Sequence, residues 1–422
     1  MINSRTPSSK ILVGIDARAT EPGFKAHYGR GTGRYAAELL ANLASLEMRE
    51  NYSDLGFVPL DAAALKVSDF GSTVCQVLPF GRQTMATQLF LPQKIRSIGK
   101  EQELSLLHFL AHSDATPRCP VPYLVTVLDL IPLRFPELYA AKVGGLRFKF
   151  ARYLEQESIR KALGIIAISE ATKRDVVQLL GISEEKVRVT HLAAGDGFRE
   201  GEALAEFERE NLSKQVKGRL GIEVGRKLLL YVGGIDPRKN IVFLLKVLAR
   251  IPKPIRPVLV LAGAIEKDDQ FPILQRTIEQ EGIRGDIVLT GYISDLELAE
   301  LYRTATAFVF PSLYEGFGLP VLEAMGIGLP VIAGDNSAIP EVTGDASLLL
   351  PDGDSASWET AISRVVQESD MTAAMRKKGL ERAKLFSWER TAEQTAEAYR
   401  FFASSLRNPD HISSSYAVNG DR

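Results

Sequence analysis

Short apolar runs bounded by turn residues recur along the whole chain and define its pattern. They are almost continuously apolar rather than alternating, as expected of strands buried on both faces of a parallel sheet. In the first half the runs lie at 10–16, 104–110, 122–130, 163–169 and 186–192. In the second half they lie at 228–234, 257–263, 286–292, 307–312, 329–334 and 346–351. Each run is predicted to be a strand.

Helical patterns lie between these runs. The segment SEATKRDVVQLLG begins with Ser169 and ends with Gly181, which suit the two ends of a helix. GRYAAELLANLASL near the N-terminus and DLELAELYRTA in the second half are further examples. Strands and helices in alternation predict an α/β protein built from doubly wound parallel sheets.

The alternation is interrupted once, by a polar and charged stretch at 197–226 that we interpret as a connection containing a helix. The length of 422 residues also exceeds what one core of roughly 200 residues accounts for. We therefore predict two Rossmann-like domains, 1–196 and 197–385. A long amphipathic helix is predicted at 386–405, and the tail at 406–422 has the composition of disorder.

Composition narrows the classes of function. The chain is 45% hydrophobic and 24% charged with a net charge of -1, which argues against a nucleic-acid partner. Cys75 and Cys119 form neither a disulfide framework nor a metal spacing, as is typical of the reducing cytoplasm. We expect no signal peptide, and no run approaches the roughly 18 uncharged apolar residues that span a bilayer. The expected localisation is cytoplasmic.

His108 and His112 lie four residues apart, but LSLLHFL has the pattern of a strand rather than a helix. A structural role for this pair is favoured over a metal site, and no metal or cofactor is expected. The DGDS stretch at 352–355 is interpreted as a turn.

The candidate chemistry is concentrated in FVFPSLYEGFGLPVLEAMGIGLPVIAG, residues 308–334, an apolar run that carries Glu315 and Glu323. The pattern predicts a buried strand, a glycine-containing loop and a short helix with Pro320 in its first turn. Ligands of open α/β sheets bind at the carboxyl ends of strands, and a helix N-terminus favours anions. A sugar nucleotide fits this arrangement, with its diphosphate at the helix and its hydroxyls on the carboxylates. A structural salt bridge for Glu323 and a solvated Glu315 are the alternative.

A second strand end carries two cations. LLLYVGG runs into IDPRKN, which places Arg238 and Lys239 between a strand and the helix that follows. There they could clamp a diphosphate. A solvated basic turn is the alternative.

These motifs together resemble the retaining GT-B glycosyltransferases of family 4. The resemblance is close over about 228–354, through VGGIDPRKN, the segment that contains E-x7-E, and AIPEVTGDASLLLPDGD. It is weaker in the first half, in GRGTGRY and VTVLDLIPLRFPELY. It implies two Rossmann-like domains facing each other across a cleft, with the last helix returning to the first domain.

The resemblance also implies roles for the matching residues. Arg238 and Lys239 would neutralise the donor diphosphate, Glu315 would hold hydroxyls of the donor sugar, and Glu323 those of the ribose. The other implied donor contacts are the backbone of Gly316, Phe317, Gly318 and Leu319, the turn at Gly234, Tyr292 and Ile293 at the nucleobase, and Gly31 and Gly33 in the first domain.

Two departures from the family pattern bear on activity. The family often has histidine at the position of Leu128, where it touches the donor sugar, and Leu128 cannot make that hydrogen bond. Either Asp129 or a nearby residue substitutes, or turnover is weaker, or the chain binds without catalysis. Gly234 stands where many members have an arginine for the phosphate. Retention in the family is ascribed to front-face displacement, which requires no protein base.

The segment 134–161 alternates cations with aromatic residues, as in GGLRFKFARYL. It is interpreted either as a patch that meets a bilayer or a lipid-linked acceptor, or as a solvated helix with a packed aromatic face. The favoured function is a mannosyltransferase that uses GDP-mannose and a glycan or lipid-linked acceptor in cell-surface polysaccharide synthesis. A non-catalytic nucleotide-sugar-binding homologue or partner subunit is the alternative. A non-hydrolysing epimerase would need acid and base side chains for which the sequence offers no convincing set.

Overall fold

The computed structural model describes residues 10–22, 31–65, 90–138, 146–198 and 206–407. The chain divides into two compact units. Unit 1 comprises Met1–Leu192 with Trp388–Arg422, and unit 2 comprises Ala193–Ser387. The boundary thus lies slightly before the expected 196/197, and the final helix begins slightly after the expected residue 386. The predicted tail lies outside the described residues from 408 onward.

Unit 1 contains a parallel sheet of six strands in the order β2-β1-β3-β4-β5-β6. The strands are β1 (Ile11–Asp16), β2 (Leu55–Leu60), β3 (Leu106–Phe109), β4 (Tyr123–Val127), β5 (Gly164–Ala167) and β6 (Val187–Val189). All five strands expected in this half are confirmed. β2 was missed because its sequence, LGFVPL, contains a glycine and Pro59. Proline is tolerated there because β2 is an edge strand that pairs with β1 alone.

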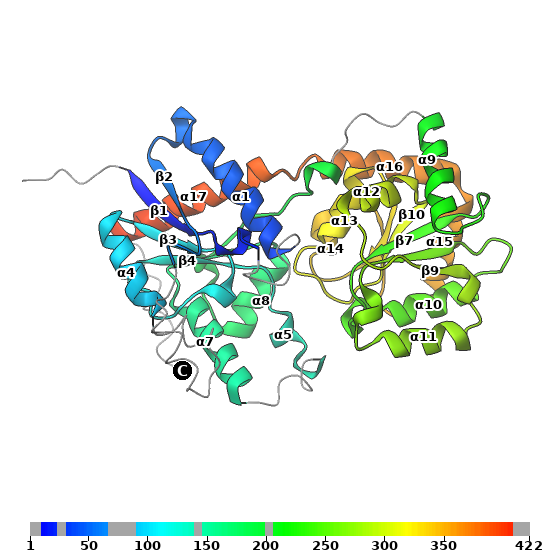
Figure 1. Ribbon diagram of the computed structural model, residues 1–422, viewed down its shortest axis with the longest axis horizontal. Coiled ribbons are helices and arrows are strands. Elements are labelled where there is room, and N and C mark those ends of the chain that lie inside the picture. Colours follow the sequence, from blue (N-terminus) through cyan, green and yellow to red (C-terminus); the bar gives the residue numbers. More distant parts are fainter. Residues whose placement is uncertain (1–9, 23–30, 66–89, 139–145, 199–205, 408–422) are drawn as a thin grey trace, which may run out of the picture. The chain divides into compact units, whose positions relative to one another are not determined.

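Helices cover both faces of this sheet, with α1 and α17 on one and α4, α7 and α8 on the other (Figure 1). The helices of unit 1 are α1 (Thr32–Glu47), α4 (Leu91–Glu101), α5 (Ile131–Arg134), α7 (Leu146–Lys161), α8 (Glu170–Leu180) and α17 (Trp388–Arg407). The caps expected for α8 are confirmed: the Ser169 side chain accepts from the Thr172 N–H, and Gly181 has a φ of 64°. α17 packs on α1, β1 and β5, so the end of the chain completes the first unit.

A buried hydrogen-bond chain ties α17 to the sheet of unit 1. His108 on β3 contacts the Tyr399 hydroxyl of α17 at 2.7 Å through Nδ1 and the Thr126 hydroxyl at 2.8 Å through Nε2. The Tyr35 hydroxyl of α1 lies 2.9 Å from the same threonine. All four side chains are buried. The structural role expected for His108 is confirmed.

Unit 2 contains a second parallel sheet, in the order β12-β11-β10-β7-β8-β9. Its strands are β7 (Leu228–Val232), β8 (Val258–Ala262), β9 (Ile287–Leu289), β10 (Ala307–Phe310), β11 (Val331–Gly334) and β12 (Leu348–Leu350), all of which were expected. β7 leads outward in one direction to β8 and β9, whereas β10 leads in the other direction to β11 and β12. The sheet order therefore reverses between β7 and β10.

The reversal of strand order places helices on both faces of this sheet, α10 and α11 on one face and α12 and α13 on the other (Figure 1). They are α9 (Glu206–Arg219), α10 (Ile241–Arg250), α11 (Phe271–Gln280), α12 (Asp295–Thr304), α13 (Leu319–Gly326), α14 (Ile339–Thr343), α15 (Ser355–Gln367) and α16 (Ser369–Ala383). The expected α/β class with two doubly wound sheets is confirmed. In the described part of the chain, no helix is both long and apolar enough to cross a membrane.

Short 3-10 helices connect these elements. They are η1 (Arg18–Thr20), η2 (Glu50–Tyr52), η3 (His112–Asp114) and η4 (Glu184–Lys186) in unit 1, and η5 (Asp196–Phe198), η6 (Pro237–Lys239), η7 (Ile265–Lys267) and η8 (Arg284–Asp286) in unit 2.

Candidate functional site

The loops that leave β7 and β10 meet at the point where the strand order of unit 2 reverses. This is where an open α/β sheet leaves a crevice for a ligand, because neighbouring strands send their connections to opposite faces. The two loops are joined directly, since the Leu313 N–H donates to the Arg238 carbonyl at 2.8 Å. Residues far apart in the sequence are therefore brought to one site.

An ionic cluster occupies this site. The Lys239 ammonium donates to Glu315 Oε1 at 2.6 Å, and the Arg238 guanidinium lies 3.1 Å from the same oxygen. Ser312 donates its hydroxyl to that oxygen as well. Arg238 also donates to the Tyr314 carbonyl at 2.6 Å. Glu315 and Arg238 are 9% and 8% exposed, so these charges are largely out of water and depend on one another.

Two opposing effects set the protonation of Glu315. Burial disfavours its charged form and raises the pKa, but Lys239 and Arg238 outweigh burial. The pKa of the Glu315 carboxyl consequently lies below its usual range. The carboxylate is therefore ionised at neutral pH. Lys239 has three N–H donors, of which Glu315 takes one, so the ammonium can also reach a second acceptor.

The glycine-containing loop ends at the N-terminus of α13. Gly318 is the N-cap and has a φ of 98°, a conformation that residues with a side chain rarely adopt. Leu319 and Pro320 open the helix, and the Val321 and Leu322 N–H groups both donate to the Gly318 carbonyl, at 2.9 and 3.2 Å. The positive end of the short helix dipole therefore lies at Leu319. The Glu315 N–H donates to Ser337 Oγ at 2.9 Å, which holds the loop from the other side. This is the expected sequence of strand end, loop and helix start.

Alanine at Gly318 is expected to destabilise unit 2 by about 1–3 kcal/mol, because the new residue must adopt a positive φ. Its Cβ would also lie 2.6 Å from Ile339 Cδ1. Gly234→Ala is the matched control, since a Cβ there meets nothing within 4 Å. Urea unfolding of both variants checks this, and equal stabilities would contradict the strained-loop account.

Glu323 lies one turn inside α13 and is 6% exposed. Its Oε2 accepts from the Tyr302 hydroxyl at 3.2 Å, so a buried phenol on α12 orients the carboxylate. The same hydroxyl lies 3.3 Å from the Pro320 carbonyl. Glu323 is thus held in place and is not a freely solvated side chain.

The remaining candidates in unit 2 lie at other strand ends. Gly234 follows β7 and is exposed, and its carbonyl accepts from the buried Tyr231 hydroxyl. Tyr292 and Ile293 follow β9, and Tyr292 is 76% exposed. Phe317 is instead buried, and its ring meets Phe386 edge-on at 6.0 Å.

Three candidates belong to unit 1. Gly31 caps α1 with a φ of 61°, and Gly33 is buried in the first turn of that helix. Asp129 follows β4, and its Oδ1 accepts from the Ile131 N–H at 3.1 Å, at the start of α5. Leu128 beside it is half-buried.

Sequence reasoning missed the partners that hold the site. Ser312 and Ser337 fix Glu315, Asn336 donates to the Ser312 carbonyl at 2.9 Å, and Tyr302 fixes Glu323. Ser312 could have been predicted as a partner of Glu315, because it lies only three residues before it in PSLYE. Tyr302 gave no signal, because it has the pattern of an apolar helix face in ELYRTA.

The DGDS stretch, expected to be a turn, also caps a helix, since Asp354 Oδ1 accepts from the Ser357 N–H at 3.1 Å at the start of α15. Residues 139–145 of the basic aromatic segment lie outside the described residues. In its described part, Arg152 pairs with Glu155 and Arg160 with Glu157. No group of three or more His, Cys, Asp or Glu among the described residues could hold a metal ion.

Comparison with known families identifies unit 2. Residues 213–382 match the model of the glycosyl transferases group 1. Unit 2 belongs to this family. The matched range contains the ionic cluster, the glycine-containing loop and Glu323, so the resemblance expected from the sequence is confirmed.

Two of the curated relatives of the chain come from Escherichia coli. O-antigen chain mannosyltransferase B is 32% identical over 257 residues, which cover 59% of this chain and 64% of the relative. Serotype-specific mannosyltransferase WbdA is 28% identical over 311 residues, covering 72% of this chain and 37% of the relative. The chain thus spans less than two thirds of the length of each.

Solved structures agree on the fold. Sucrose-phosphate synthase from Thermosynechococcus elongatus aligns with a TM-score of 0.64 at 18% identity, over 94% of this chain and 100% of the other. WaaG, described as a glycosyltransferase involved in lipopolysaccharide biosynthesis, aligns with a TM-score of 0.63 at 14% identity, over 92% and 99%. The chain therefore has the expected two-domain GT-B fold.

Proposed function

We propose that this protein is a retaining glycosyltransferase that moves mannose from GDP-mannose to a glycan or lipid-linked acceptor during synthesis of a cell-surface polysaccharide. The observation that carries this proposal is the buried cluster of Glu315, Lys239 and Arg238 beside the N-terminus of α13. Support for mannose comes from the names of the two Escherichia coli relatives, both mannosyltransferases.

In this proposal the cations of the cluster bind the diphosphate of the donor and its carboxylate binds the sugar. The diphosphate lies against the cations of Arg238 and Lys239 and the positive end of α13 at Leu319, which stabilise the charge that grows as the nucleotide leaves. Glu315 accepts from hydroxyls of the mannose, and Glu323 from those of the ribose. Tyr292 and Ile293 stand beside the base.

The transfer step relies on positioning. The acceptor hydroxyl attacks the anomeric carbon on the face from which the nucleotide diphosphate departs, and a phosphate oxygen takes the acceptor proton. The configuration is retained and no metal is required. The chain contributes orientation and charge stabilisation rather than a base. In unit 1, Gly31 and Gly33 would approach the diphosphate and the acceptor, and Asp129 would take the place of the histidine that touches the donor sugar.

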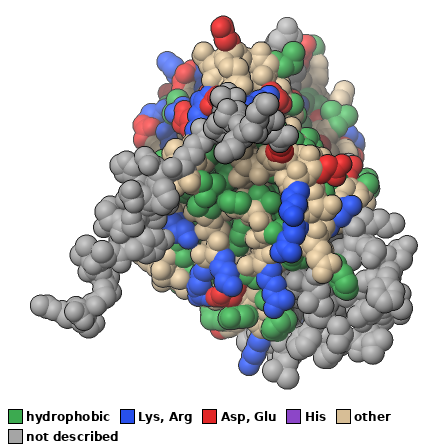
Figure 2. All heavy atoms as spheres, turned by 90° about the vertical axis from the view of Figure 1, so that its left-hand side faces the viewer, with side chains coloured by type: hydrophobic (Ala, Val, Ile, Leu, Met, Phe, Trp, Pro, Cys, Tyr) green, Lys and Arg blue, Asp and Glu red, His purple; other side chains and the backbone are tan. Residues whose placement is uncertain are grey.

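A lipid-linked acceptor would bring the protein to a membrane surface. One face of the molecule carries lysine and arginine side chains around a group of hydrophobic ones (Figure 2). On α17, Phe401 is 42% exposed and lies 3.8 Å below the Arg188 guanidinium. Such mixed surfaces favour anionic interfaces, and we propose peripheral contact of this kind.

Transfer is tested with a panel of GDP- and UDP-sugars, using donor hydrolysis and transfer to simple mannosides. We expect turnover with GDP-mannose, an α-linked product by NMR, and loss of both with Lys239→Ala. Turnover with a different donor would overturn the choice of mannose. GDP-mannose binding without turnover on a competent acceptor would favour the non-catalytic alternative.

Phenylalanine at Tyr302 is expected to weaken GDP binding by about tenfold, because a hydrogen bond to a charged group contributes about 1.5–3 kcal/mol. The loss should appear with GDP but shrink with 2′,3′-dideoxy-GDP, since in this proposal Tyr302 affects the nucleotide through Glu323 and the ribose hydroxyls. Calorimetric titration checks this. An equal loss with both nucleotides would point to a merely structural role for Tyr302.

A further inference from the structure

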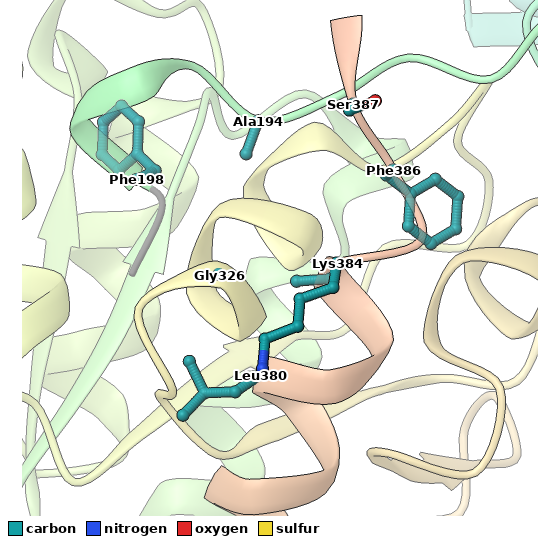
Figure 3. A pocket seen from close by; sticks show the side chains of 8 residues that line it. Ala194, Phe198, Gly326, Leu380, Lys384, Phe386 and Ser387 are labelled. Atoms are coloured by element: carbon teal, nitrogen blue, oxygen red, sulfur yellow. The ribbon is translucent and has the colours of Figure 1, made fainter. Parts of the chain in front are cut away.

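A cavity of about 280 Å³ lies at the other end of α13, away from the site described above. Phe198, Leu380 and Phe386 provide most of its apolar lining, Gly326 closes it at the end of α13, and Lys384 runs back along α16 toward Leu380 (Figure 3). All of its lining residues belong to unit 2. Neither the mechanism nor the family match assigns it a role.

The two aromatic walls of this cavity each touch one arm of the donor site. The Phe198 ring meets Tyr302 edge-on at 5.5 Å, and the Tyr302 hydroxyl holds Glu323 at 3.2 Å. The Phe386 ring meets Phe317 edge-on at 6.0 Å, and Phe317 lies between the two glycines of the donor loop. Phe198, Tyr302 and Phe317 are buried and Phe386 is half-buried. Because closely packed rings limit each other's movement, an occupant of the cavity would restrain both arms.

The electrostatics of the cavity define the ligand class. Its charged residue, Lys384, is already 2.9 Å from Glu381. The last residues of α13 and α16, Gly326 and Ala383, also line it, and the C-terminus of a helix carries a partial negative charge of about one half. Such a site opposes an anion and favours a neutral ligand that offers a hydrogen-bond donor. A volume well above the roughly 150 Å³ that encloses benzene suits two fused rings.

We propose that this cavity is a second ligand site, for a neutral, flat, two-ring molecule with a hydrogen-bond donor, and that its occupation tightens nucleotide binding at the donor site. An occupant fixes Phe198 and Phe386. Tyr302 with Glu323, and Phe317 with its glycines, are then ordered before the nucleotide arrives. The nucleotide then loses less conformational entropy when it binds, so the two ligands bind with positive coupling. The coupling rests on the proposed donor site, whereas binding in the cavity does not.

The first test uses 2-naphthol as the probe and 2-naphthoate as its charged match. Calorimetry on the full-length protein should show one molecule of 2-naphthol bound per chain, and 2-naphthoate at least tenfold weaker. Ala383→Trp, which fills the cavity, should abolish binding while the protein still melts cooperatively. Absence of binding to the native protein, or tighter binding of the naphthoate, overturns the site. If Ala383→Trp does not fold, the location is decided on the native protein. Adding 2-naphthol should then slow amide exchange at Leu380 and Phe386 or shift their NMR signals, and no change at either residue overturns the site.

The coupling is tested by the GDP dissociation constant with and without saturating 2-naphthol. We expect GDP to bind about fivefold tighter or more, and 2-naphthol to gain by the same factor when GDP is present. Phe198→Leu with Phe386→Leu should still bind 2-naphthol but lose this gain. An unchanged GDP constant overturns the coupling. If GDP does not bind at all, the proposed function fails, and slower amide exchange over 313–326 on adding 2-naphthol still decides the coupling.

Discussion

Glutamine in place of Glu315 is expected to destabilise unit 2 by about 3 kcal/mol and to abolish sugar transfer. The carboxylate lies 2.6 Å from Lys239 and 3.1 Å from Arg238, and it is nine-tenths buried. Its removal leaves two cations side by side with little water to solvate them. Removing one partner of a buried pair costs more than the pair itself contributes, because the remaining charge is left uncompensated.

The loss can be measured in unit 2 alone, because each unit contains one tryptophan. Trp358 lies in α15 and Trp388 at the start of α17. In a Trp388→Phe background, fluorescence during urea unfolding reports unit 2. The matched control is Glu359→Gln, which breaks an exposed ion pair of 2.7 Å with Arg250 and should cost less than about 1 kcal/mol. Similar losses in the two variants would contradict the buried-cluster account.

GDP separates the two roles that Glu315 is given. The nucleotide carries a diphosphate but no sugar, so it replaces the missing negative charge next to Arg238 and Lys239. We expect Glu315→Gln to bind GDP at least as tightly as the native protein and to recover much of its stability when GDP is bound. Transfer from GDP-mannose should stay lost, because the sugar hydroxyls lack their acceptor. Weaker GDP binding would mean that Glu315 serves the phosphates rather than the sugar.

The local sequence determines much of the fold. Eleven apolar runs predicted eleven strands, because strands buried on both faces leave continuous apolar stretches. β2 escaped this criterion since it is an edge strand with Pro59 exposed. The capping residues Ser169 and Gly181 were identifiable because helix ends require particular side chains.

The site was predictable residue by residue but not as an assembly. The glycines and the single acid of YEGFG predicted a ligand loop, and Arg238 and Lys239 were expected at the end of a second strand. That these cations pair with Glu315 follows from β10 lying next to β7, which is a property of strand order and not of either segment. Tyr302 is a further case, because only the packing of α12 on α13 shows that its hydroxyl reaches Glu323.

The hydrogen-bond chain in unit 1 predicts a marked loss of stability in acid. Burial lowers the pKa of His108 to about 3, whereas histidine in an unfolded chain has a pKa near 6.5. Below about pH 6.5 the histidine of the unfolded chain binds a proton that the folded chain does not. The free energy of unfolding therefore falls as the pH falls from 6.5 toward 3, and above pH 6.5 this effect is absent. The contribution of this one histidine at pH 5 is a loss of about 2 kcal/mol.

Replacement of His108 by glutamine keeps a polar group between Tyr399 and Thr126 but removes the titration. In a Trp358→Phe background, Trp388 fluorescence reports unit 1, and the stability lost between pH 7.5 and 5 should shrink by about 2 kcal/mol in the variant. His191→Gln in the same unit is the control and should keep the acid sensitivity of the parent. The variant will be less stable at neutral pH, so the slope with pH decides rather than the stability itself. An unchanged slope would mean that groups other than His108 cause the loss of stability in acid. The hydrogen bonds from His108 to Tyr399 and Thr126 would then tolerate protonation of the imidazole.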